Sequence, residues 1–389
     1  MAELRVGIIG IGNQGGSYAT YFTQHPEWGI RIVAVADINP DRLAWAEKEV
    51  PEAARFDDAL AMLDSGLIDG CMINVPHYDH PTYAIECMRR GIHVMVDKPA
   101  GVYTKQVKEM NAEADQHPEV VFGMMFNQRT TGVYRKLREL VQSGEYGELR
   151  RVNWIITSWY RPQMYYDSGE WRATWAGEGG AVLMNQCPHQ MDLLQWICGM
   201  PVKLRSFVHY GKWHDIETED DVTTYMEFAN GATGVFITST GDPHGTNRFE
   251  IQMDKGRFVV DGTTLHITTY DTAASEFTKT STEMFGCPTW TTEEYTGEIP
   301  EMPHAVVAKA WAEAIAGEGK LIADGREGLN GTMLSNAMQL SGFIGKEVTL
   351  PIDDELYYTE LMKRVATSRR KEGVKAVFTD TTGTYGGTK

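Results

Sequence analysis

Residues 5–15 read RVGIIGIGNQG, and this stretch decides the fold of the N-terminal half of the chain. A short apolar run, Arg5–Ile9, leads into Gly10–Gly15, which matches the pattern GxGxxG. An amphipathic segment over 14–22 follows the glycines, and Asp37 ends the next apolar run. A strand, a glycine turn, a helix and an acidic residue about 20 positions further on together indicate a dinucleotide-binding unit.

Each glycine in this turn has a physical role. Gly10 permits the tight turn, Gly12 lets the backbone approach a pyrophosphate, and Gly15 lets helix and strand pack closely. The helix then offers its first N–H groups, near Asn13 and Gln14, to the phosphates.

Asp37 predicts which nicotinamide dinucleotide binds. Its carboxylate can accept hydrogen bonds from the adenosine ribose hydroxyls, and its charge repels a 2′-phosphate. The sequence therefore favours NAD over NADP. Arg42, close by, leaves open a contact with a phosphate.

Short apolar runs and longer amphipathic runs alternate through the first 125 residues, which predicts βαβ units and a parallel sheet. The expected strands cover 5–9, 31–36, 71–75, 93–96 and 120–125, and the expected helices cover 14–22, 42–49, 58–63, 83–90 and 105–114.

The pattern changes after Asn127. A helix over 133–142, a strand over 149–159 and a helical run ending at Cys198 precede successive strands over 202–269, and helices return at 305–316 and 329–342. The predicted fold class is therefore α/β, with an N-terminal Rossmann domain (1–126) and a C-terminal α+β domain (127–389). A large, mostly antiparallel open sheet is expected in the second domain, and 366–389 is expected to be a frayed tail or an arm.

Composition excludes several classes of partner. The formal net charge of −17 disfavours binding to nucleic acids and to anionic membranes, and no apolar run approaches the roughly 20 residues that span a bilayer. The five cysteines are odd in number and scattered, which favours a reducing cytoplasm over a disulfide framework. No metal site is expected, although His77 and His80 have HxxH spacing.

Three further segments carry a recognisable combination. Val75–His80 reads VPHYDH, Val96–Pro99 reads VDKP, and Gly179–Asp192 contains Gly179-Gly180, Asn185, His189 and Asp192. Together with the glycine turn, this order and spacing resembles the Gfo/Idh/MocA oxidoreductase family from residue 5 to about 345.

The resemblance implies roles for these residues. Lys98 would stand beside the nicotinamide and the substrate, after a Lys98–Pro99 bond in the cis form, and His189 would be the acid/base residue. The residues expected on the cofactor side, besides the glycine turn and Asp37, are Asn74, Pro76, His80, Asp97, Lys98 and Asn127.

The chain also departs from the family pattern. Asp97 stands where the family usually has Glu, and Asn185 where it frequently has Asp, so a proton-transfer role for position 185 is in doubt, although Asn185 can bind a substrate hydroxyl. Pro188 predicts that a helix begins or kinks there, because proline inside a helix costs about 3 kcal/mol. Asp192 is expected to be a structural charge.

An aromatic and arginine-rich stretch over 159–175 suggests the substrate. Aromatic faces can meet the C–H faces of a sugar, and arginine donors can meet its hydroxyls. The expected substrate-binding residues are Tyr160, Arg161, Trp171, Arg172 and Asn185.

These residues favour an NAD-dependent dehydrogenase that oxidises a ring hydroxyl of a sugar, glycoside or inositol, with carbon 3 of a glucoside as the favoured position. His189 suits the proton step and Lys98 can stabilise the alkoxide, while hydride transfer belongs to the nicotinamide. Two alternatives stay open, an NAD-assisted glycosidase and a non-catalytic NAD-binding regulator. A homo-oligomer is expected from the resemblance.

Overall fold

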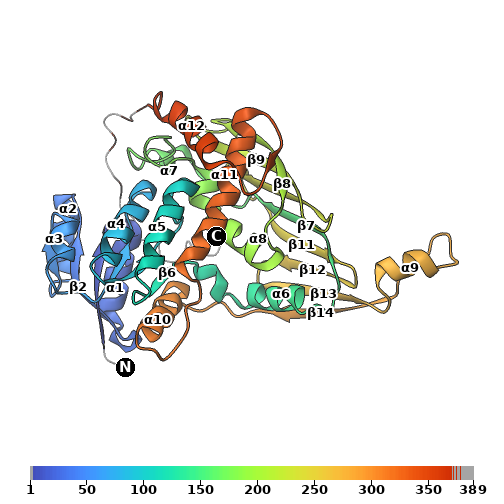
Figure 1. The fold of residues 1–389 in the computed structure, drawn as a ribbon, viewed down its shortest axis with the longest axis horizontal. Helices are drawn as coiled ribbons and strands as arrows, with labels where there is room; N and C mark the ends of the chain where they lie inside the picture. Colours follow the sequence, from blue (N-terminus) through green and yellow to red (C-terminus); the bar gives the residue numbers. More distant parts are fainter. Residues whose placement is uncertain (1–2, 370, 372–373, 375–376, 378–389) are drawn as a thin grey trace.

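Two sheets organise the molecule (Figure 1), and the computed structural model describes residues 3–369, 371, 374 and 377. The expected tail or arm over 366–389 lies mostly outside these described residues.

The first sheet has six parallel strands in the order β3-β2-β1-β4-β5-β6. This is the Rossmann order, and ligands bind such sheets at the carboxyl edge where the strand order reverses, here between β1 and β4. The strands are β1 (Leu4–Ile9), β2 (Ile30–Ala36), β3 (Ala54–Phe56), β4 (Gly70–Ile73), β5 (His93–Val96) and β6 (Phe122–Met124).

Helices cover both faces of this sheet, so the strands are buried on consecutive positions, as predicted; all four residues of β4 are buried. The connecting helices are α1 (Asn13–Gln24), η1 (Pro26–Trp28), α2 (Pro40–Glu49), α3 (Ala59–Leu63), η2 (His77–Asp79), α4 (His80–Met88) and α5 (Thr104–Gln116).

One helix of this domain comes from far along the chain. Helix α10 (Pro303–Ile315) packs its apolar residues into the core beneath β1, β2 and β4. The ring of Trp311 lies so close to β4 that a Cβ on Gly70 would meet it at 2.6 Å. The core of the Rossmann domain thus includes residues that follow all but the last strand of the second sheet in sequence.

The second sheet has nine strands in the order β14-β13-β12-β11-β7-β10-β9-β8-β15, and all neighbouring pairs are antiparallel except β7 with β10. The predicted mostly antiparallel sheet is confirmed. The strands are β7 (Leu149–Ile156), β8 (Lys203–Tyr210), β9 (Glu219–Glu227), β10 (Thr233–Ser239), β11 (Asn247–Met253), β12 (Gly256–Asp261), β13 (Thr264–Tyr270), β14 (Trp290–Thr296) and β15 (Val348–Thr349).

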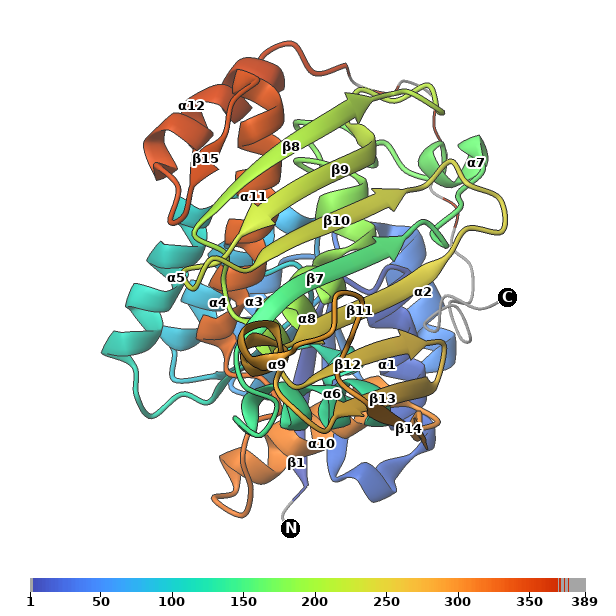
Figure 2. The same ribbon diagram turned by 90° about the vertical axis from the view of Figure 1, so that its right-hand side faces the viewer.

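Only one face of the second sheet packs against helices. Trp154 stacks on Phe249 at 4.0 Å within the core on that face. Figure 2 looks onto the opposite face, where Phe207 and Tyr225 are exposed. The remaining elements are η3 (Asn127–Thr130), α6 (Gly132–Gln142), α7 (Gln163–Tyr166), the π-helix η4 (Val182–Gln186), α8 (Pro188–Cys198), α9 (Ala274–Thr280), η5 (Gly325–Glu327), α11 (Gly328–Ile344) and α12 (Asp354–Val365).

Helix α8 begins at Pro188, as predicted, because proline is tolerated in the first turn. The preceding η4 is held by Glu219, whose buried Oε1 accepts from the backbone N–H groups of Ala181 and Leu183. Burial raises the pKa of Glu219 to about 7.

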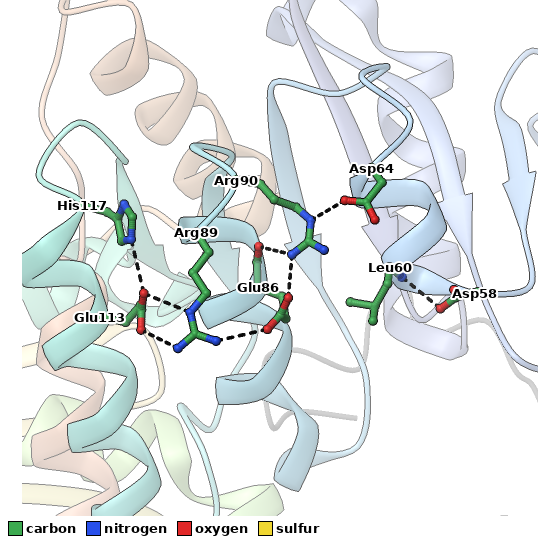
Figure 3. Close-up of polar contacts among 8 residues, drawn as sticks. All are labelled: Asp58, Leu60, Asp64, Glu86, Arg89, Arg90, Glu113 and His117. Carbon is green, nitrogen blue, oxygen red and sulfur yellow. Dashed lines mark hydrogen bonds and ion pairs between the residues drawn. The ribbon is translucent and has the colours of Figure 1, made fainter.

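Surface ion pairs join α4 to its neighbours (Figure 3). Arg89 pairs with Glu113 of α5 at 3.0 Å, and Arg90 pairs with Asp64 at the end of α3 at 2.7 Å. Exposed pairs of this kind contribute at most about 1 kcal/mol each, so they fix helix positions more than they stabilise the fold.

None of the described helices is long and apolar enough to cross a membrane.

Candidate active site

The glycine turn has the geometry that its sequence predicts. Gly10 has φ +83°, and a Cβ on it would meet the carbonyl oxygen of Asn74 at 2.7 Å. A Cβ on Gly15 would lie 2.0 Å from the carbonyl oxygen of Gly10, whereas one on Gly12 would meet nothing within 4 Å. Two glycines are therefore needed for packing, and the third leaves open space at the helix N-terminus, where a pyrophosphate would approach.

Asp37 follows β2 and reaches back to the glycine turn. One carboxylate oxygen accepts from the N–H of Ile11 at 2.9 Å, and the other accepts from the N–H of Asn39 at 2.8 Å. Arg42 Nε donates to the carbonyl oxygen of Ile11 at 2.6 Å, and its guanidinium stacks on Trp45 at 4.2 Å. The arginine therefore braces the glycine turn.

Asp97 joins the ends of β4 and β5. Its Oδ2 accepts from Asn74 Nδ2 at 2.8 Å and from the Tyr18 hydroxyl at 3.3 Å, and its Oδ1 accepts from the N–H of Lys98 at 2.7 Å. Asp97, which is one carbon shorter than the usual glutamate, thus holds the backbone at Lys98. Asn74 Oδ1 is buried with no hydrogen-bond partner.

His80 uses both of its ring nitrogens within the protein. Nδ1 lies 2.6 Å from the carbonyl oxygen of Pro99, and Nε2 lies 2.8 Å from that of Val75. The imidazole braces the segment after Lys98 against the turn at Pro76, which is exposed at this edge of the sheet. The Lys98–Pro99 bond is cis, as predicted.

Lys98 and His189 lie close enough for the charge of one to act on the other. Lys98 Nζ donates to the backbone carbonyl oxygen of Asn185 at 3.0 Å. Burial lowers the pKa of Lys98. Burial, then the charge of Lys98 and then His304 hold the pKa of His189 well below its usual range, so His189 is neutral and can accept a proton.

His304, at the start of α10, is a neighbour that the sequence did not reveal. Its ring lies 5.5 Å from that of Tyr18, and burial together with the charge of Lys98 lowers its pKa to about 3. Helix α10 therefore adds an uncharged imidazole to the catalytic centre.

A buried carboxyl group orients Asn185. Asn185 Nδ2 donates to Glu178 Oε1, and Glu178 Oε2 accepts from the N–H of Ala173 at 2.5 Å. Burial raises the pKa of Glu178, with Arg172 and Lys98 opposing the rise. Because the amide nitrogen faces Glu178, the side-chain oxygen of Asn185 is the atom presented to a substrate hydroxyl.

The arginine-rich stretch gathers around Tyr165, which sequence reasoning did not select. Arg172 stacks on this ring at 4.5 Å and Arg161 at 5.1 Å, and Arg172 also lies 4.8 Å from the ring of Trp171. The Tyr165 hydroxyl accepts from Arg172 Nη1 at 2.9 Å and from Gln186 Nε2 at 3.0 Å.

Of the five expected substrate residues, the structure brings four together in this way: Arg161, Trp171, Arg172 and Asn185. Tyr160 is different, since its side chain is 46% exposed and its carbonyl oxygen accepts from Arg161.

Two other polar groups behave as structural elements. Asp192 forms a buried two-point ion pair with Arg129, at 2.6 and 2.8 Å, as its expected structural role requires. The HxxH pair has ring centroids 5.9 Å apart, and no group of three or more possible metal ligands occurs in the part of the chain that the structure describes.

The residues at the carboxyl edge fit an NAD molecule. The open space at Gly12 suits a pyrophosphate, and the acidic Asp37 suits ribose hydroxyls. Asn74 Oδ1, Asn127 Oδ1 and His189 Nδ1 are buried without partners, and such groups usually find one when a ligand binds.

Family models match both halves of the chain. Residues 4–124 match the oxidoreductase family with an NAD-binding Rossmann fold, and residues 134–259 match the GFO/IDH/MocA C-terminal domain. The chain belongs to the Gfo/Idh/MocA family. Its N-terminal domain is the NAD-binding domain of that family.

Individual proteins similar to this chain are named as dehydrogenases. It is 23% identical over 266 residues to a myo-inositol 2-dehydrogenase of Thermotoga maritima, covering 66% of this chain and 75% of that protein. It is 27% identical over 251 residues to a D-glucoside 3-dehydrogenase of Escherichia coli, covering 59% and 68%. The crystal structure of the WlbA dehydrogenase from Chromobacterium violaceum with NADH and UDP-GlcNAcA superposes with a TM-score of 0.78 at 26% identity, covering 91% and 97%.

Curated relatives are matched over part of their length. The matched segment spans 59% to 75% of five of them, four of which are inositol dehydrogenases. In four of the five the span is less than two thirds.

Proposed function

We propose that this Gfo/Idh/MocA protein is an NAD-dependent dehydrogenase that oxidises a secondary ring hydroxyl of a sugar, glycoside or inositol. The observation that carries the proposal is a buried Lys98 at the carboxyl edge of the Rossmann sheet, which donates to the backbone of Asn185 and whose charge helps to keep His189 neutral. A regulator that only binds NAD has no need for a depressed imidazole pKa beside a buried lysine.

The residues divide the chemistry between them. NAD, when bound, supplies the hydride acceptor. His189 accepts the hydroxyl proton, and the Lys98 ammonium donates a hydrogen bond to the oxygen on which negative charge develops. Asn185, oriented by Glu178, accepts a hydrogen bond from a neighbouring substrate hydroxyl.

Relatives support a cyclic polyol as the substrate. Their names include inositol 2-dehydrogenases and a D-glucoside 3-dehydrogenase, and the rings Tyr165 and Trp171 offer flat faces of the kind that bind sugar C–H groups. Carbon 3 of a glucoside is the position we favour. We further propose that the exposed face of the nine-stranded sheet, which carries Phe207 and Tyr225, joins copies of the chain into a homo-oligomer.

The test is NADH formation by purified protein with NAD and a panel of inositols, aldoses and methyl or aryl glucosides. Lys98→Ala is the catalytic control, and Arg89→Gln, in the surface ion pairs of Figure 3, is the matched control for loss of one cation. We expect one substrate class to give NADH that is lost in Lys98→Ala and kept in Arg89→Gln.

Other outcomes distinguish the alternatives. Release of an aglycone from an aryl glucoside without net NADH would replace the dehydrogenase with an NAD-assisted glycosidase. If the biological activity survives in both Lys98→Ala and His189→Ala, the protein is a non-catalytic NAD-binding regulator and the dehydrogenase proposal is wrong.

A further inference from the structure

Three cations share the site although the chain as a whole carries a formal charge of −17. Arg161 and Arg172 flank the Tyr165 ring, with their guanidinium carbons 5.1 and 4.5 Å from its centroid. After burial and the opposing charge of Asp97, these arginines contribute to the lowered pKa of Lys98, so all three positive charges sense one another.

Neither guanidinium is neutralised by an ion pair in the part of the chain that the structure describes. Arg172 donates to the neutral oxygens of Ser168, at 3.2 Å, and Tyr165, at 2.9 Å. Arg161 donates from Nη1 to the backbone carbonyl oxygen of Tyr160 at 2.9 Å. Each guanidinium has five N–H donors, so both retain donors for a further acceptor.

The nearest carboxyl group does not fill this need. Glu178 lies within electrostatic reach of Arg172 and Lys98, but its two oxygens already accept from Asn185 and Ala173. Its pKa is raised by burial, which lessens its negative charge near neutral pH. A fourth cation, Lys371, lies at the rim and donates to the carbonyl oxygen of Tyr166 at 2.7 Å.

Positive charges that are half-buried together repel one another, and an anion relieves this cost when it binds. The planar fork of arginine matches the two oxygens of a carboxylate or phosphate, and such charge-assisted bonds are about twice as strong as bonds to neutral hydroxyls. A neutral sugar would leave the charge of both arginines uncompensated.

Resting on the proposed function, we propose that the substrate is an acidic sugar or cyclitol, whose carboxylate or phosphate binds Arg161 and Arg172 while a ring hydroxyl reaches Lys98 and His189. Both guanidinium groups lie over the same tyrosine ring, 4.5 and 5.1 Å from its centroid, which places them in one site. The aromatic faces of Trp171 and Tyr165 then pack beside the ring of the substrate. The acidic group thereby sets which end of the substrate enters the catalytic centre.

The test measures binding directly, so that it does not depend on turnover. Calorimetric titrations of the full-length protein with saturating NADH compare glucuronate, gluconate, glucose 6-phosphate, glucose and myo-inositol. We expect at least one acidic ligand to bind about 10-fold or more tightly than its neutral counterpart and to weaken as salt is raised. Comparing glucuronate and gluconate with glucose 6-phosphate shows whether the site recognises a carboxylate or a phosphate.

Matched variants locate the effect. Arg172→Gln and Arg161→Gln should each weaken the acidic ligand about 10-fold or more and should weaken its neutral counterpart by a smaller factor, whereas Arg172→Lys should retain part of the affinity for the acid. Arg89→Gln, which removes one cation from the distant surface pairs, should leave every affinity unchanged. The salt dependence of the wild-type protein gives the same information if a variant fails to fold.

Equal binding of acidic and neutral ligands, or no binding of any acid, overturns the inference. NADH formation from a neutral sugar, without preference for its acid, overturns it and keeps the dehydrogenase. Tight binding of an acid that depends on Arg172, without NADH formation from any substrate, keeps the charge recognition and overturns the dehydrogenase.

Discussion

The two sheets of this protein contribute to one site in different ways. In the parallel sheet every strand points its carboxyl end at the same edge, so residues that follow β1, β2, β4 and β5 converge without help from the rest of the chain. In the antiparallel sheet successive strands run in opposite directions, and the groups that reach the site come from the segment between β7 and β8. In the function that we propose, the parallel half holds the cofactor and Lys98, and the other half holds the substrate.

The largest expected effect tests whether the second half also supplies the proton acceptor. His189→Asn should lower kcat/KM by about 10² to 10⁴-fold, as loss of a general base does, while the Kd of NADH changes little. Because the pKa of His189 lies well below its usual 6.5, the wild-type oxidation rate should stay level as the pH falls through 6.5. A rate that halves near pH 6.5 would contradict the neutral imidazole.

A smaller effect is expected where the second half only orients a group. Glu178→Gln leaves one acceptor oxygen for two donors, Asn185 Nδ2 and the N–H of Ala173, so Asn185 is held less firmly and kcat/KM should fall by about 10 to 100-fold through misplacement of the substrate. In steady-state kinetics, most of this fall should appear as a rise in KM and the smaller part as a fall in kcat. Glu86→Gln, on the surface of α4, is the matched control, and an equal loss there would contradict the orienting role.

A substitution in the parallel half tests the preference for NAD over NADP. Asp37→Asn keeps an oxygen that can accept from the N–H of Ile11 or Asn39 but removes the charge. We expect the Kd of NAD to rise about 10-fold and that of NADP to stay constant or fall, measured by calorimetry. A variant that still rejects NADP as strongly as the wild type would assign the preference to another residue.

The last effect is on stability instead of activity, and it concerns Glu219 beneath the Gly179-Gly180 turn. Glu219 is protonated up to pH about 7 in the folded state but ionises near 4.5 when unfolded. The unfolded state therefore loses its proton first, and stability falls between these two pH values by up to about 3 kcal/mol.

Glu219→Gln should remove that fall, because glutamine keeps an oxygen that accepts from Ala181 and Leu183. The Tm of the variant should match the wild type at pH 4.5 and exceed it by a few degrees at pH 8. A variant that melts lower at pH 8 would show that the ionised carboxylate stabilises the turn.

The sequence predicted most of the parallel half because its signals are local. Gly10, Gly15 and Asp37 are fixed by backbone geometry within one βαβ unit, and the helices and longer strands lie within a few residues of their predicted bounds. Strands of two or three residues, such as β3 and β15, are too short to show a period.

The remaining features of the site depend on contacts between segments that are distant in sequence. Asp97 and His80 were assigned to the cofactor, but their hydrogen bonds join neighbouring turns of the protein. Glu178 was not among the predicted site residues, and its burial became visible only in the fold. A glutamate directly before a glycine pair and seven residues from an asparagine is the signal that could have found it.

His304 was missed for a related reason, since it precedes a helix that was read as part of the second domain. That helix belongs to the first domain's core, where Trp311 fills the space beside Gly70.

This placement of Trp311 has a consequence for how the protein is made. Trp311 is synthesised about 240 residues after Gly70, so a ribosome adding about 5 to 20 residues per second needs on the order of 10 to 50 seconds between them. During that interval the nascent Rossmann domain exposes the apolar surface that α10 later covers. A chain cut near residue 126 would keep that surface permanently uncovered, and it should bind chaperones rather than accumulate as a free NAD-binding module.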